Sequence, residues 1–387
     1  MSRSAEALVE PQMLVWAREA ACLDTRMASI KAAVKEDRLI EWETGNSRPT
    51  TIQLRKLAQI YRQSFAAFCL PSPPDEHVPR LHDYRRLAGA GKIELSYELV
   101  MELRHAADRR NIALELLALD KKDVPSFNLT STMGDDPERV AERIRDLLNI
   151  NDNQQQRWKD NRIAFNALRE AGEAAGIIIF QATGVRVEEM RGFSISEYPL
   201  PAVVVNRKDA YAGRSFTLIH EIAHLTLRTN GLCDLASPTN DYQGDSAEVF
   251  CNYVAGATIA PARLLLADRD IATAKKPLRW SDDKLAALAR QFSTSREMIL
   301  RRLLILNLTT GAYYEEKRKQ YVEELKLIKR EGRFLSPPKD VISSAGRKYT
   351  RTVLEALNAG HITANDASDY LGLRLKHLHV ISESIGV

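Results

Sequence analysis

The segment Arg214-Ser-Phe-Thr-Leu-Ile-His-Glu-Ile-Ala-His224 places two histidines four residues apart, with a glutamate directly after the first. Its other positions are mostly apolar, which predicts a core helix over about residues 215–230. Residues four apart share one face of a helix, so the imidazoles of His220 and His224 lie about one turn apart. Two imidazoles and a carboxylate are costly to bury without partners, and the three together predict a bound cation.

The spacing of the two imidazoles suits two nitrogen ligands of one zinc ion. Glu221, next to the first ligand, is placed to reach a metal-bound water rather than the metal. Zinc lowers the pKa of that water to about 7, and the carboxylate takes its proton as the water attacks a peptide carbonyl. The motif therefore predicts peptide hydrolysis with Glu221 as the general base. The side chains considered for stabilising the oxyanion are Tyr211, Arg214, Tyr242 and Tyr253.

A catalytic zinc site needs a third protein ligand and an open fourth position. Glu248 is the preferred ligand, because it falls on a second predicted helix, over about residues 245–259. Its rivals are Asp241 and Asp245, in or beside the preceding loop, and the thiol of Cys251. Two imidazoles and one carboxylate also suit non-haem iron, but the helical spacing with its built-in base favours Zn²⁺.

The rest of the chain reads as helical, with two short runs of β-branched residues. Residues 177–180 and 201–206 predict strands. Helical periodicity predicts helices over about residues 94–119, 137–149 and 164–175, and three short helices within 346–385. The expected fold class is mainly α with a small β-sheet (α+β).

Four separated motifs occur in the order found in the ImmA/IrrE metallopeptidases, which the chain resembles over about residues 164–307. The motifs are Gly192-Phe-Ser-Ile195, Val203-Val-Val-Asn206, Arg214 to His224, and Glu248-Val-Phe-Cys-Asn252. The resemblance implies that His220, His224 and Glu248 are the zinc ligands. It also implies that Glu221 is the catalytic base.

This chain departs mildly from the family's pattern. Ile222 and Ala223 replace the usual leucine and glycine, Cys251 replaces an alanine, and Tyr253-Val254 replaces a variable residue and phenylalanine. None of these changes affects a ligand. The resemblance implies a regulatory endopeptidase that acts in a stress response and cleaves a protein, typically a DNA-binding repressor.

Residues 23–45 resemble the helix-turn-helix of XRE-type (lambda-repressor-like) regulators, and Trp42-Glu43-Thr44-Gly45 matches the end of that motif. The resemblance covers about residues 11–70 and implies a five-helix domain that binds DNA. The expected contacts are Lys35, Arg38 and Arg48. The exposed face of the would-be recognition helix is mostly acidic, through Glu36, Asp37 and Glu41, and such residues repel phosphates. A protein-docking or dimerising surface is the alternative.

Three prolines in Leu70-Pro-Ser-Pro-Pro-Asp75 predict the first domain boundary, because proline lacks a backbone donor and disfavours helix before it. We expect a helix-turn-helix domain, a helical connector, a zinc peptidase domain and a helical C-terminal extension. These parts span residues 1–74, 75–160, 161–312 and 313–387.

The composition fits a cytoplasmic protein with no membrane partner. The net charge of +4 is too mild to indicate nucleic-acid binding by itself. The sequence contains neither a long apolar run nor a signal peptide, and its four cysteines lack a pairing pattern, so we expect reduced thiols. Two hypotheses compete with the peptidase. One is a DNA-binding regulator or antitoxin-like protein whose metal site is structural or inactive, and the other is a plain core helix without metal.

Overall fold

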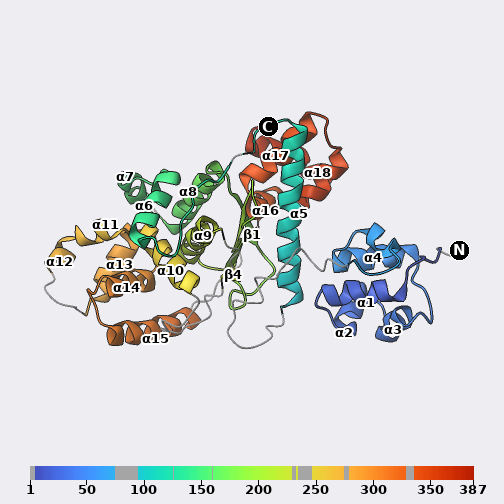
Figure 1. The fold of residues 1–387 in the computed structure, drawn as a ribbon, viewed down its shortest axis with the longest axis horizontal. Coiled ribbons are helices and arrows are strands. Elements are labelled where there is room, and N and C mark those ends of the chain that lie inside the picture. Colours follow the sequence, from blue (N-terminus) through green and yellow to red (C-terminus); the bar gives the residue numbers. More distant parts are fainter. Residues whose placement is uncertain are drawn as a thin grey trace. The chain divides into compact units, whose positions relative to one another are not determined.

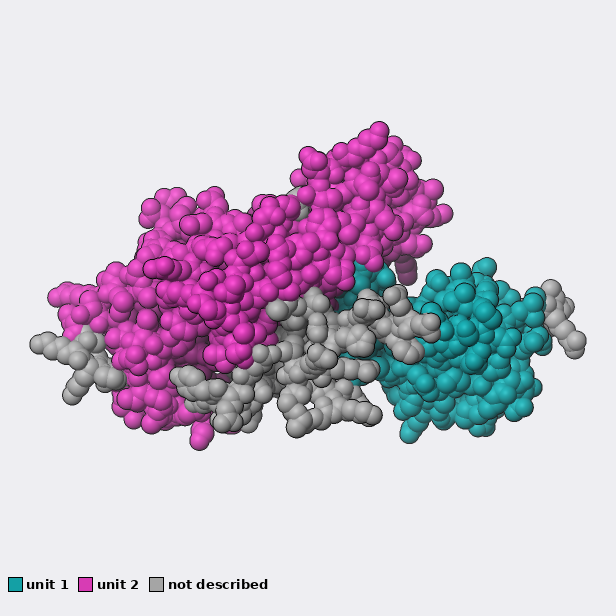
Figure 2. Space-filling model, viewed as in Figure 1, with its two compact units in different colours: residues 1–108 teal, residues 109–387 magenta. Residues whose placement is uncertain are grey.

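The computed structural model describes residues 5–74, 95–124, 126–158, 160–228, 232–233, 246–273, 279–327 and 335–387. The chain forms two compact units, residues 1–108 and 109–387, drawn in teal and magenta in Figure 2. None of the helices in the described ranges combines the length and the apolar character that a membrane crossing requires. The contacts group the chain into these two units. The division into four parts expected from the sequence stays a prediction.

The smaller unit is helical (Figure 1). It contains α1 (Pro11–Ala20), α2 (Thr25–Ala32), α3 (Glu36–Glu43), α4 (Thr51–Tyr61) and the 3-10 helix η1 (Phe65–Cys69). Helix α5 (Tyr97–Leu119) contains the boundary at Asp108. The core includes the fully buried side chains of Met13, Leu39 and Tyr61.

Helices α2 and α3 are joined by a short turn. Asp24 caps α2 by accepting a hydrogen bond of 2.6 Å from the backbone N–H of Met27. The turn begins at Ala33, whose φ of +55° reverses the chain. Gly45 follows the last turn of α3 with a φ of +78°, a conformation that glycine adopts readily after a helix. The helical content expected here is present, whereas the family of this unit stays a prediction.

The larger unit combines a small sheet with many helices. Its strands are β1 (Ile178–Ala182), β2 (Gly192–Ile195), β3 (Ala202–Asn206) and β4 (Leu232–Cys233). Its helices after α5 are α6 (Pro137–Leu147), α7 (Asp152–Gln156), α8 (Asn161–Ala174), α9 (Tyr211–Thr226), α10 (Ser246–Ile259), α11 (Ala262–Leu266), α12 (Arg269–Ala272), α13 (Asp282–Gln291), α14 (Arg296–Ile305), α15 (Gly311–Leu327), α16 (Pro337–Ala345), α17 (Arg347–Asn358), α18 (Ala364–Leu371), η2 (Leu375–His377) and α19 (Leu378–Ile385). The expected class, mainly α with a small β-sheet, is confirmed.

The sheet has the strand order β1-β3-β2-β4. β1 and β3 are parallel, while β2 runs antiparallel to both β3 and β4. The two expected strands correspond to β1 and β3, whose residues are all buried. β2 and β4 were not predicted as strands. β2 is short and begins with a glycine, so its strand structure depends on pairing with β3 rather than on propensity.

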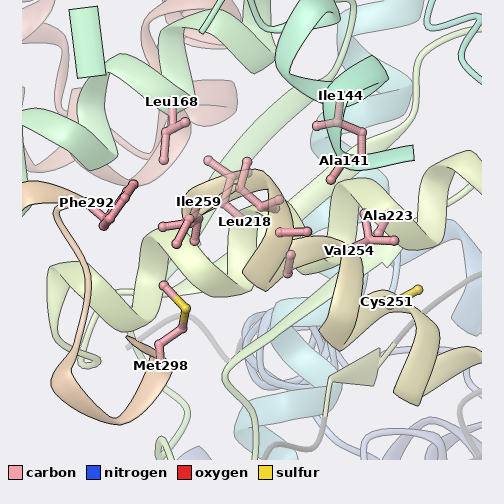
Figure 3. Packing of buried hydrophobic residues seen from close by; sticks show 14 of the residues in the cluster. Ala141, Ile144, Leu168, Leu218, Ala223, Cys251, Val254, Ile259, Phe292 and Met298 are labelled. Atoms are coloured by element: carbon pink, nitrogen blue, oxygen red, sulfur yellow. The ribbon is translucent and has the colours of Figure 1, made fainter. Parts of the chain in front are cut away.

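Helix α9 lies between the sheet and α10. It packs on β2 and β3, on α8 and on α10, and α6 covers the far side of α10. Figure 3 shows the apolar contacts that hold these layers, among them Leu218 of α9, Val254 of α10 and Ile144 of α6. All three side chains are buried. The helix with the two histidines is therefore the centre of the largest core of the protein.

The C-terminal helices are part of the larger unit. Helix α16 packs against β1, an end strand of the sheet. Arg169 of α8 donates hydrogen bonds to the carbonyl oxygens of Ile179 and Ser343, both at 2.7 Å. The Gln181 side chain donates to the same Ser343 oxygen at 2.6 Å, and Lys348 Nζ donates to the carbonyl oxygen of Glu173. These polar contacts attach α16 to β1 and α8, and α17 to α8.

The junction between α16 and α17 predicts a difference between two glycine substitutions. Gly346 has φ +87° and ψ 157°, and an added Cβ would lie 2.6 Å from Glu173 Oε1 and 3.0 Å from the Ile179 carbonyl oxygen. Gly360 also has a positive φ, +75°, but an added Cβ would meet nothing within 4 Å. We expect Gly346→Ala to lower the free energy of unfolding by about 3 kcal/mol and Gly360→Ala by about 1 kcal/mol. Urea denaturation measures both, and equal losses would contradict the crowding at Gly346.

Candidate metal centre

Helix α9 holds His220 and His224 on one face, inside the core. Their side chains are 0% and 2% exposed. The two Nε2 atoms lie 3.1 Å apart. Two nitrogen ligands at ordinary zinc distances and a tetrahedral angle lie about 3.3 Å apart. The pair therefore has the separation that one metal ion requires, within a few tenths of an ångström.

Glu248, in the first turn of α10, completes the group. Its Oε2 lies 3.2 Å from His220 Nε2, and its Oε1 lies 2.9 Å from His224 Nε2. The ligand atoms of the three residues all lie within 4.8 Å of one another. Among the described residues, this is the one group that could hold a metal ion. The structure thus brings together the three residues that the sequence analysis selected as ligands.

The alternative candidates for the third ligand differ from Glu248 in their placement. Asp241 and Asp245 lie outside the described residues. Cys251 is fully buried, and its thiol lies against His224. It is not a member of the group whose ligand atoms converge. Cys251 therefore adjoins a ligand rather than standing in place of Glu248.

The charges of the three converging side chains are coupled. Burial would raise the pKa of Glu248, but contacts with both imidazoles outweigh it and lower that pKa. Burial would lower the pKa of His224, but contacts with Cys251 and Glu248 raise it to about 11. For His220, burial prevails and lowers the pKa. The Glu248 carboxylate is therefore held in its ionised form, the form in which a carboxylate binds a cation.

Glu221 has a fully buried side chain on the side of α9 that faces β2. Burial raises the pKa of its carboxyl to about 8, against the opposing effects of His224 and the Ser194 hydroxyl. A carboxylic acid that titrates near neutral pH can both accept and donate a proton, which is what a general base and acid needs. The geometry is consistent with the role expected for Glu221.

Gly192 lets β2 approach the motif helix closely. An added Cβ would lie 2.4 Å from Thr217 Cγ2, 2.8 Å from the Val204 carbonyl oxygen and 3.7 Å from Glu221 Cγ. A larger residue would push β2 away from α9. Gly192 belongs to one of the four sequence motifs, but only the packing shows its role.

Two further neighbours touch His220. The ring of Phe216, one turn earlier on α9, stacks on it with centroids 6.3 Å apart and planes inclined by 29°. Asn252, one turn after Glu248 on α10, contacts the imidazole from the other helix. Neither residue had a predicted role. The four-residue spacing from Glu248 to Asn252 was the signal that could have identified the second.

The side chains considered for the oxyanion have other partners. Arg214 donates to the carbonyl oxygen of Asp209 at 2.8 Å and to Gln181 Oε1 at 3.1 Å, and it lies over the Tyr211 ring at 4.3 Å. Arg302 lies over the Tyr253 ring at 5.4 Å. Tyr242 is outside the described residues. The oxyanion role of these side chains stays a prediction.

The expected DNA contacts lie on the smaller unit. Lys35 is the exposed N-cap residue of α3, and Arg48 is exposed in the segment before α4. Arg38 is exposed too, but it forms an ion pair of 2.6 Å with Glu41 and lies over the Trp42 ring. Lys35 and Arg48 are therefore placed differently from Arg38, whose charge is offset by that of Glu41.

Comparison with protein families gives one match. Residues 174–304 match the family model of the M78 peptidases, described as the IrrE N-terminal-like domain. This segment extends from the end of α8 to α14 and includes the whole candidate metal centre. Comparison with curated proteins and with solved structures finds no match. The matched segment is thus similar to a metallopeptidase domain of the ImmA/IrrE type.

The buried carboxyl of Glu221 predicts a pH-dependent stability. Because burial raises its pKa from 4.5 to about 8, the folded chain binds this proton more tightly than the unfolded chain does. The stability due to the bound proton is complete at low pH and is lost as the pH rises from about 4.5 to 8. We expect Glu221→Gln to stabilise the chelator-treated protein by an amount that grows with pH, to a few kcal/mol at about pH 8. Urea denaturation from about pH 5 to pH 8 measures this amount, and a constant difference from wild type would contradict it.

Proposed function

We propose that the larger unit is a zinc-dependent endopeptidase that cleaves a protein. The convergence of His220, His224 and Glu248, from two packed helices, carries the proposal. Two imidazoles and one carboxylate are a common donor set of catalytic zinc, and they leave the fourth position for water or substrate. The match to the M78 peptidase family supports the same reaction.

In this proposal, three residues bind the metal and a fourth transfers protons. His220, His224 and Glu248 would hold the ion, and their neighbours in the core keep them fixed. When bound, Zn²⁺ supplies a Lewis acid for the peptide carbonyl and lowers the pKa of water at its open position. Glu221 takes the proton of the attacking water and returns it to the leaving amine. Its raised pKa suits both transfers, because the carboxyl titrates near neutral pH.

The substrate that we propose is a DNA-binding repressor, which makes the enzyme a regulator of a stress response. The support is the resemblance to ImmA/IrrE proteins and the presence of a second, helical unit in the same chain. Cys22, Cys69 and Cys251 are not joined in disulfides within the described part of the chain, which supports a cytoplasmic location, where disulfides are rare.

Metal analysis and two variants test the enzyme. We expect about one zinc per chain in wild type and in Glu221→Gln, and much less in Glu248→Ala, because a missing ligand weakens binding. The zinc-loaded Glu221→Gln variant should capture its substrate from an extract of the source cells. Wild type should then cleave the captured protein, and Glu221→Gln should be slower by on the order of 10²-fold or more. Equal zinc in wild type and Glu248→Ala would remove Glu248 from the site, and equal cleavage rates would remove Glu221 from the reaction.

For the smaller unit we propose XRE-type DNA binding, which would bring the peptidase to a repressor on its operator. The short turn between α2 and α3 and the exposed side chains of Lys35 and Arg48 favour this function. The acidic side chains on α3 favour the alternative, a docking or dimerising surface for protein. In that alternative the chain is a regulator whose metal site is structural or inactive.

Gel shift at several salt concentrations separates these functions. If the unit binds DNA, binding to the operator of the captured repressor should weaken steeply with salt, because phosphate contacts release counterions. The double variant Lys35→Glu/Arg48→Glu should abolish binding, whereas Arg38→Gln should weaken it less, since Arg38 is already paired with Glu41. Retention of full affinity by the double variant would exclude this surface as the DNA reader.

A further inference from the structure

Two buried polar atoms on facing helices of the metal centre lack a hydrogen bond. They are His220 Nδ1 on α9 and Asn252 Oδ1 on α10, and neither has a partner of normal geometry among the described residues. The His220 side chain is 0% exposed, so bulk water does not reach its ring. Buried polar groups in proteins are almost always paired, and each exception needs a reason.

The chemistry of the two atoms is complementary. If Nε2 of His220 gives its lone pair to a metal, the neutral ring must carry its proton on Nδ1. That N–H is a donor that needs an acceptor, and the side-chain oxygen of Asn252 is an acceptor that needs a donor. Most metal-binding histidines use their second nitrogen in this way, which fixes the orientation of the ring.

The helices place Asn252 correctly for this role. Asn252 follows Glu248 by four residues, so both lie on the same face of α10. Glu248 already reaches His220 Nε2 at 3.2 Å across the contact between α9 and α10. The next residue, Tyr253, lies instead beside the guanidinium of Arg302.

The Asn252 side chain also acts on the imidazole. It interacts with the His220 ring across the contact between α9 and α10. Phe216 limits the ring from its own helix by stacking at 6.3 Å. A hydrogen bond donated by His220 Nδ1 to Asn252 Oδ1 would restrict the remaining motion, the rotation of the imidazole in its own plane.

We propose that Asn252 is a positioning residue, whose amide oxygen accepts a hydrogen bond from His220 Nδ1 and thereby aims Nε2 at the metal. This inference rests on the proposed function, because it presumes that the site binds zinc. Cys251, the preceding residue, lies against His224. One turn of α10 would thus provide an outer neighbour for each of the two imidazoles.

A neutral amide has a particular consequence for the metal. A carboxylate in the same position would draw the Nδ1 proton towards itself and make the imidazole a stronger ligand. Asn252 fixes the ring without adding a negative charge, so the centre has Glu248 as its one anionic ligand. An aspartate at position 252 should therefore keep or increase zinc affinity, whereas an apolar residue of similar size should reduce it.

The test measures zinc affinity in the full chain by competition with a chromophoric chelator. We expect Asn252→Leu to weaken zinc binding by about 10- to 100-fold, and Asn252→Asp to bind at least as tightly as wild type. Tyr253→Phe is the matched control on the same helix and should bind zinc like wild type. In zinc-loaded protein with ¹⁵N-labelled histidine, the Nδ1 proton of His220 should be protected from exchange in wild type and not in Asn252→Leu.

The outcomes separate this inference from the proposed function. If wild type binds zinc and folded Asn252→Leu binds it equally well, Asn252 has no positioning role and the proposed function stands. If Asn252→Leu does not fold, weaker zinc binding by Asn252→Asp than by wild type would overturn the inference. If wild type binds no zinc, both the inference and the proposed function are overturned.

Discussion

Glu248 contacts two buried imidazoles at once, and the larger unit depends on this charged contact. A carboxylate and two histidines in the centre of an apolar core would be destabilising if any one of them lacked a partner. The distances from Glu248 to the two imidazoles, 3.2 Å and 2.9 Å, show that α9 and α10 are packed at the separation that these groups require. The apolar side chains around them then determine how far the helices can move.

The elements packed around α9 and α10 hold these two helices at that separation. α9 is supported by β2 and β3 on one side and by α10 on the other, and α6 closes the outer side of α10. Gly192 removes a side chain where the sheet must come closest to the helix. Glu221 is therefore held between the sheet and the histidines, in an environment that raises its pKa to about 8. The reactivity expected of this residue follows from its burial rather than from a special neighbour.

The site could be predicted from the sequence because its residues have fixed helical spacings. His220 and His224 are one turn apart, and Glu248 was the acid on the next predicted helix. β1 and β3 were predictable from their runs of β-branched residues, whereas β2 is a strand because of pairing that no local pattern encodes. The roles of Gly192 and Asn252 depend on distances between elements, which periodicity does not give. The grouping of residues 313–387 with the larger unit depends on contacts such as that between Arg169 and Ser343, 174 positions apart.

The attachment of α16 to β1 has a consequence for self-association. β1 stands at one end of the sheet, where a strand exposes carbonyl and amide groups that can pair with another chain. Here the guanidinium of Arg169 binds the Ile179 carbonyl oxygen, and the backbone at Gly346 lies beside the same atom. These contacts block this edge of the sheet, so loss of the C-terminal helices would uncover a template for strand-to-strand aggregation. The C-terminal helices therefore cover an edge of the sheet as well as adding to the core of the larger unit.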